Sequence, residues 1–231
     1  MYTPPMSFTL KTTWSANGLG RKLGWVIAVL SGLHILVMLI HYLVTDIPWL
    51  IVELFDLDEE QSFGTWFSVV ILLFTGYVLL LYSASQSRQG DSGILAWRIL
   101  GIGFCFLSID EMVGLHETVN SVIEMSWAIP GGLIALAIGV IYIPFLMGLP
   151  RPTLFRFLIG GMLYVGGAVG VELATEPYAE ADLLDTLEYN LTTVLEEAME
   201  MSGVLVFLTG LLRHIATTDS GAVDSDAVVK T

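Results

Sequence analysis

Long apolar runs, separated by short charged segments, follow one another along this chain. Three of them contain no Asp, Glu, Lys or Arg over 23, 27 and 26 residues. A helix that crosses the hydrocarbon core of a bilayer needs about 20 mostly apolar residues. These runs therefore predict three membrane-spanning helices, Leu23–Val44, Thr65–Ser83 and Trp127–Met147.

Three further apolar runs are shorter. Ile99–Ile109, Phe157–Val171 and Met201–Leu212 hold 11, 15 and 12 residues. At a rise of about 1.5 Å per residue they cover roughly 16, 22 and 18 Å of a core about 30 Å thick. They span only if each helix continues through the carboxylates beside it, and this interpretation gives six spans. The Ile47–Gln61 segment predicts a short amphipathic helix on the outer surface.

The predicted fold class is therefore all-α: a polytopic membrane helical bundle with six transmembrane spans and one short outer helix. Residues 1–22 are expected to form an N-terminal arm. Residues 23–213 are expected to form the transmembrane domain, and residues 214–231 a disordered acidic tail.

The basic residues predict the orientation of this bundle. Cytoplasmic loops of membrane proteins carry an excess of Lys and Arg. With a cytoplasmic N-terminus and six spans, all nine Lys and Arg lie on the cytoplasmic side. All but four of the 23 Asp and Glu lie outside the membrane or in its outer half. Both termini are therefore expected in the cytoplasm.

Composition agrees with a membrane protein and narrows its partners. Hydrophobic residues make up 55% of the chain and charged residues 14%, against about 25% charged in a soluble domain. A net charge of −14 argues against a nucleic-acid partner. The partners that remain are the lipid bilayer and either other membrane subunits or further copies of this chain. No Lys lies within a predicted span, which excludes a retinal Schiff base.

Ionisable residues within the predicted spans are the strongest functional signal, because a charge inside a bilayer costs several kcal/mol. The third, fifth and sixth spans each carry acids at a similar depth, and two histidines are expected at or near that depth. We expect these side chains to converge between neighbouring helices. The candidate site residues are Asp110, Glu111, His116, Glu117, Glu172, Glu196, Glu197, Glu200 and His34.

The chemistry of these acids indicates a positively charged ligand. Like charges repel, and the basic side chains lie on the other side of the membrane, so either a divalent cation binds or the carboxylates share protons. Carboxylates with imidazole suit Zn, Mn or Fe, and carboxylates alone suit Ca. Haem with two axial histidines is disfavoured. The Asp56–Glu60 stretch matches the start of a calcium-binding loop but lacks its glycine and later Glu.

Two smaller features are expected to be structural. His214, next to Arg213, is expected at the inner membrane interface. Gly166 and Gly170 are spaced as in the small-residue faces that let two helices pack closely.

Four stretches carry a resemblance to other proteins. They are FDLDEEQSFGTWFS (55–68), LSIDEMVGLHE (107–117), VGGAVGVE (165–172) and LEEAMEMSGV (195–204). With them, most of residues 50–212 resembles a group of uncharacterised bacterial multi-pass membrane proteins. The resemblance implies a bacterial inner-membrane location and no activity or catalytic residue.

The predicted function is an integral membrane protein whose outward-facing carboxylate and histidine cluster binds a divalent cation or shares protons. One alternative is a non-catalytic accessory subunit of a larger membrane complex. Another is a proton- or cation-coupled transporter, and a fourth is a metal-dependent intramembrane enzyme. Whether the protein is an enzyme stays open on the sequence.

Overall fold

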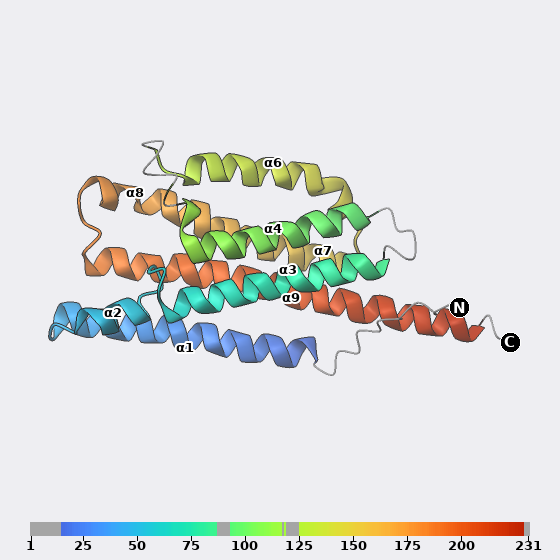
Figure 1. Ribbon diagram of the computed structural model, residues 1–231, viewed down its shortest axis with the longest axis horizontal. Helices are drawn as coiled ribbons and strands as arrows, with labels where there is room; N and C mark the ends of the chain where they lie inside the picture. The colour runs from blue at the N-terminus through green and yellow to red at the C-terminus, as the bar shows by residue number, and fades with distance from the viewer. Residues whose placement is uncertain (1–14, 87–92, 117, 119–124, 229–231) are drawn as a thin grey trace, which may run out of the picture.

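The computed structural model describes residues 15–86, 93–116, 118 and 125–228, and this part of the chain is helical with no strand (Figure 1). The all-α prediction is confirmed to this extent. The elements are α1 (Ala16–Leu43), α2 (Trp49–Phe55), α3 (Phe63–Gln86), α4 (Ile94–Val113), α6 (Ala128–Met147), α7 (Arg151–Val165), the π-helix η1 (Gly166–Val171), α8 (Glu172–Glu180) and α9 (Leu187–Val228).

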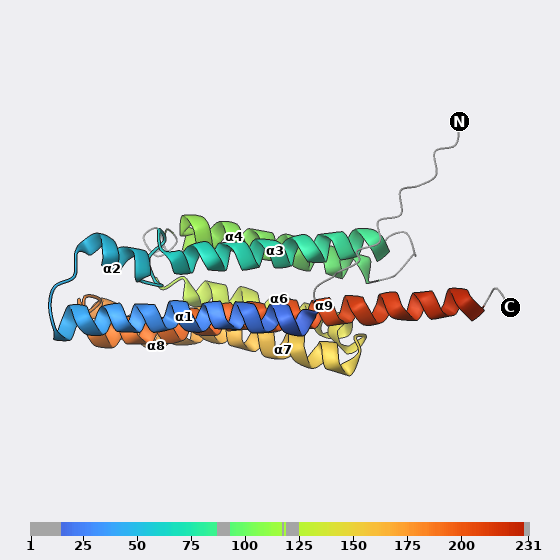
Figure 2. The ribbon, with the colours of Figure 1, turned by 90° about the horizontal axis from the view of Figure 1, so that it is seen from below.

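The long helices run side by side in one elongated bundle (Figures 1 and 2). α9 holds it together, because it packs against α1, α3, α7 and η1. α3 pairs with α4 along its length, and α6 lies across α7, η1 and α8. α7, η1 and α8 form one continuous helical segment that begins after Pro150.

The α7–α9 contact depends on two glycines that let the backbones touch. A Cβ added at Gly203 would lie 2.6 Å from the carbonyl oxygen of Gly160, and one added at Gly160 would lie 2.8 Å from that of Gly203. Small residues of this kind drive close helix packing in membranes. The glycines predicted to pack two helices closely, Gly166 and Gly170, contribute less to helix packing. A Cβ at Gly166 would approach only the Met199 side chain, and nothing lies within 4 Å of a Cβ at Gly170.

Four described segments are long and apolar enough to cross a membrane. They are Ala16–Leu43, Phe63–Gln86, Ala128–Met147 and Arg151–Glu180. They correspond to the first, second, fourth and fifth predicted spans, so the structure supports four of the six by this criterion. α4 and α9 are not among them. α4 carries Arg98, Asp110 and Glu111 within its 20 residues, and α9 carries the acids of the predicted sixth span.

The boundaries of several elements differ from the predicted ones. The outer helix is shorter than Ile47–Gln61, because α2 ends at Phe55 and residues 56–62 form a loop before α3. α1 begins at Ala16, inside the predicted arm, since Ser15 caps it by accepting a hydrogen bond from the Gly18 backbone. α9 continues to Val228, into the segment predicted as a disordered tail.

Candidate functional site

A cavity of about 1890 Å³ lies between α4, α6, the α7–η1–α8 segment and α9. Acids gather along its lining, and none of the described residues that line it is Lys or Arg. Two of these acids come from the loop before α3, two from α4, three from α8 and three from α9. The lining acids are Asp58, Glu60, Asp110, Glu111, Glu172, Glu176, Glu180, Glu196, Glu197 and Glu200.

Most of the predicted site residues border this cavity. Seven of the nine line it: Asp110, Glu111, His116, Glu172, Glu196, Glu197 and Glu200. Glu117 lies outside the described residues. His34 does not line the cavity. The helices are arranged differently from the expected mutual contact, because α4 packs against α3 and meets the other acid-bearing helices across the cavity.

Glu196 is the most enclosed of these acids. Only 8% of the residue is exposed, and the negative charges of Glu172 and Asp58 act on its carboxyl group. It lies on α9 opposite η1, where a Cβ at Gly167 would come within 2.8 Å of the Glu196 carbonyl oxygen. This close approach of η1 explains the burial. An enclosed carboxylate beside other carboxylates is costly, so this position favours a proton or a bound cation.

A second group of polar side chains lies between α3, α4, α7 and α9. Glu111, Glu200 and Tyr164 surround a small void together with Ser68. Ser68 is 5% exposed, and its hydroxyl group lies beside the Glu111 carboxyl group. The carboxyl groups of Glu111 and Glu200 are close enough for their charges to interact. This part of the site therefore has acceptors and a hydroxyl but no cationic side chain.

His116 and Asp110 form a pair at the end of α4. The chain turns at Gly114, whose φ of 55° lies in the left-handed region that glycine adopts readily. This turn returns His116 to Asp110, with Nδ1 3.1 Å from Oδ2, and the His116 backbone N–H donates to Oδ1 at 3.2 Å. The His116 ring also packs against Trp127, with centroids 5.0 Å apart. His116 therefore supplies a local partner for one acid of the cavity.

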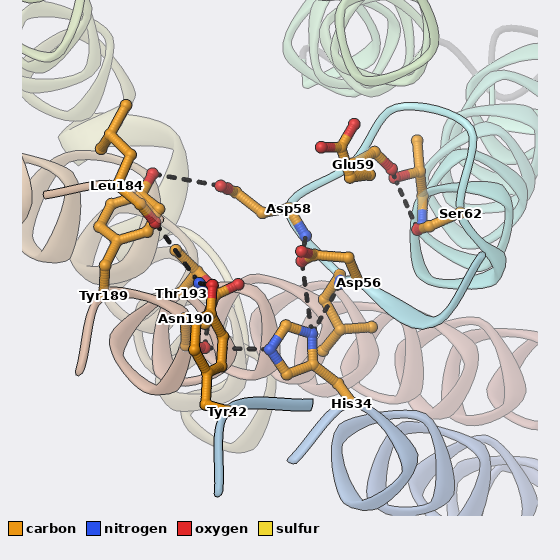
Figure 3. A network of polar contacts seen from close by, with 12 residues as sticks. His34, Tyr42, Asp56, Asp58, Glu59, Ser62, Leu184, Tyr189, Asn190 and Thr193 are labelled. Carbon is orange, nitrogen blue, oxygen red and sulfur yellow. Dashed lines mark hydrogen bonds and ion pairs between the residues drawn. The ribbon is translucent and has the colours of Figure 1, made fainter. Parts of the chain in front are cut away.

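His34 belongs to a different network, shown in Figure 3. Its ring is fully buried. The Leu57 backbone N–H donates to Nδ1 at 2.9 Å, and Nε2 lies 3.0 Å from the Asn190 carbonyl oxygen. Since a backbone N–H only donates and a carbonyl only accepts, the ring is neutral with its proton on Nε2. The prediction of His34 as a ligand is not supported by this arrangement, in which both ring nitrogens are occupied.

The acids of the loop before α3 point apart (Figure 3). Asp56 accepts a hydrogen bond from the Asp58 backbone at 3.1 Å and faces His34. Asp58 instead accepts one from the Tyr189 hydroxyl at 3.1 Å. Burial, with a smaller contribution from the charge of Glu59, raises the pKa of Asp56 to about 6. This loop therefore joins α1 to α9 and does not gather its carboxylates around one point.

Within the described residues, no group of three or more His, Cys, Asp or Glu side chains is arranged to hold a metal ion. The acids border a shared cavity without converging on one coordination point. A preformed site for Zn, Mn, Fe or Ca therefore finds no support in this part of the chain.

Sequence reasoning missed three groups of this molecule. Tyr164, Tyr189 and Ser68 lie beside the acids, but isolated tyrosines or serines in apolar helices give no signal in a sequence. His214 is buried within the protein. It lies 3.2 Å from the Tyr82 hydroxyl and stacks on Trp97.

Comparisons with known proteins give a family and no activity. No curated protein and no solved structure matches this chain. One family model matches residues 24–215, from within α1 to Ile215 in α9. The chain therefore belongs to the family described as "Domain of unknown function (DUF8692)".

Proposed function

We propose that this protein is an integral membrane protein whose acid-lined cavity binds cations and holds shared protons when no other cation is bound. The observation that carries the proposal is the composition of the cavity wall. In the part of the chain that the structure describes, ten carboxyl side chains line it, and no lining residue is Lys or Arg. A site of this composition attracts positive charge and repels anions.

The proposal includes six membrane crossings with both termini in the cytoplasm, in a bacterial inner membrane. α4 and α9 run alongside the four apolar helices (Figures 1 and 2). The 20 residues of α4 give about 30 Å of helix, the thickness of the hydrocarbon core. α1, α4 and α7, which carry basic residues near their first turns, begin at the same end of the bundle. The acids lie toward the other end, consistent with an outward-facing cavity.

Proton sharing follows from the burial and spacing of these acids. Glu196 is almost fully enclosed, and Glu111 and Glu200 face each other without a basic side chain between them. Two carboxylates that share a site cannot both ionise without a large free-energy cost. A proton or a cation held between them removes that cost. Glu200 and Glu196 are therefore the residues on which the proposal depends most.

The test compares Glu200→Gln with Glu188→Gln, which makes the same change on an exposed position of α9 outside the cavity. The measurements are thermal unfolding of metal-free protein and infrared bands of protonated carboxyl groups near neutral pH. We expect Glu200→Gln to raise the thermal stability and to weaken those bands, and Glu188→Gln to change neither.

Metal analysis of the protein, purified without chelator, completes the experiment. A retained metal, together with a Glu200→Gln variant of lower stability, would identify the bound cation as a divalent metal. The proposal would be overturned by three results together. These are a Glu200→Gln variant of lower stability, no metal retained by the protein, and no protonated carboxyl bands in the parent protein.

A further inference from the structure

The size of the cavity exceeds what a proton or a metal ion requires. It measures about 1890 Å³, whereas sites for small organic molecules usually measure about 300–1,000 Å³. Large side chains along the wall would reduce this volume, but several of the lining residues are glycines, which leave it open. Nothing lies within 4 Å of a Cβ added at Gly139 or Gly161, both of which border the cavity.

The wall of the cavity has two chemically different parts. Its acids come from the loop before α3, the end of α4, α8 and the first half of α9. The remaining wall, from α4, α6, α7 and the middle of α9, is apolar and includes Leu100, Phe104, Ile138, Phe157 and Phe207. A ligand that fills both parts must have a polar head and a hydrocarbon body. Because the carboxylates are negatively charged, that head must be positively charged.

Glu196 lies where the positive head of a ligand would be most favourable. The residue is 8% exposed and lines the cavity together with Glu172 and Asp58, whose negative charges act on it. A cationic head at this point would compensate these carboxylates.

α6 gives an apolar ligand a wall that faces the bilayer. Only 6% of the apolar stretch of α6 is buried within the protein. It is a candidate membrane span, and its other face lines the cavity. The hydrocarbon part of a ligand would therefore lie one helix away from the lipid in which such molecules dissolve.

We infer that the cavity binds an amphiphilic organic cation, with an amine or quaternary ammonium head among the carboxyl groups of α4 and α9 and a hydrocarbon chain along the apolar wall. This inference rests on the proposed function, because it names the class of cation that the acids accept. The inference depends on the apolar wall as well as the acids, whereas the proposed function depends on the acids alone.

The test measures binding to the full chain in nanodiscs of neutral phosphatidylcholine, by calorimetry against empty nanodiscs. The probes are decyltrimethylammonium, tetramethylammonium, which is the head alone, and decyl sulfate, which has the same chain with the opposite charge. We expect saturable binding of decyltrimethylammonium, at least about tenfold tighter than that of tetramethylammonium, and none of decyl sulfate.

Matched variants assign the binding to this cavity. Glu196→Gln is expected to weaken decyltrimethylammonium binding about tenfold, and Glu188→Gln to leave it unchanged. Gly139→Phe fills the apolar part, and Gly103→Phe makes the same change on α4, where nothing lies within 4 Å and the residue does not line the cavity. Only the Gly139 variant is expected to weaken decyltrimethylammonium binding, and tetramethylammonium binding should stay as it was.

Two results would overturn the inference. One is equal affinity for decyltrimethylammonium and tetramethylammonium, and the other is saturable binding of decyl sulfate. If the stability gain of Glu200→Gln and its weaker carboxyl bands are still seen, the acids hold protons or small cations and only the amphiphile is excluded. If those effects are absent as well, the proposed function fails together with the inference.

Discussion

His34 Nε2 lies 3.0 Å from the carbonyl oxygen of Asn190, and this contact joins the middle of α1 to the start of α9. Because the Leu57 backbone N–H occupies the other ring nitrogen, one imidazole connects three segments that are far apart in the chain. Two of these segments, the loop before α3 and α9, also contribute acids to the cavity. The side chain that resembles a ligand in the sequence is thus a structural link beside the site.

Replacing His34 by Ala should destabilise the protein by about 2–4 kcal/mol. The change removes two hydrogen bonds and leaves a void in a fully buried position. His41→Ala is the matched control, because His41 is partly exposed and accepts one hydrogen bond, from the Ile47 backbone at 3.1 Å. It should cost about 1 kcal/mol or less. Denaturant unfolding in mild detergent measures both, and equal losses would contradict the assigned role of His34.

Asp56 should make stability depend on pH. Its pKa is raised to about 6 from 3.8, chiefly by burial. An acid with a raised folded-state pKa favours the folded state while it is protonated, so stability should fall as pH rises from about 4 to about 6 and then level off. Asp56→Asn should remove that slope and stabilise the protein near pH 7 by up to about 3 kcal/mol. Thermal unfolding from pH 4 to pH 8 measures the effect, and an unchanged slope in the variant would refute it.

Gly160→Ala should weaken the α7–α9 contact. The new Cβ would lie 2.8 Å from the Gly203 carbonyl oxygen and 3.0 Å from the Phe207 nitrogen, both in the backbone. Overpacking of this kind typically costs about 1–3 kcal/mol. Gly161→Ala, at the next residue, meets nothing within 4 Å and should be neutral or slightly stabilising, since Ala favours a helix over Gly. Similar melting temperatures for the two variants would show that α7 and α9 do not pack as described.

Single-cysteine labelling should separate the two ends of the bundle. In a chain without Cys105, an impermeant thiol reagent added to intact cells should label Ala181→Cys, in the exposed turn between α8 and α9. Gly148→Cys, in the exposed turn between α6 and α7, should react only after the membrane is broken. Labelling of both in intact cells would contradict the six-span topology and the outward-facing cavity.

The acidic site was partly predictable because it depends on depth along each helix, which residue counting estimates. Counting from the basic ends placed Asp110, Glu111, Glu172 and Glu200 in one layer, and all four line the same cavity in the structure. The same counting placed His34 at that depth. It could not tell which way the ring faces, because rotation of α1 about its axis depends on the helices that pack against it.

The helices, the apolar segments and the segregation of basic from acidic ends could be predicted, because hydropathy and charge act locally along the chain. The cavity, the pairing of α4 with α3 and the role of His34 emerge only from the folded molecule. These depend on contacts between residues far apart, such as the 23 and 156 positions that separate His34 from its two partners. The close approach of Gly160 to Gly203 brings α7 against α9, and no local pattern encodes which two helices will meet.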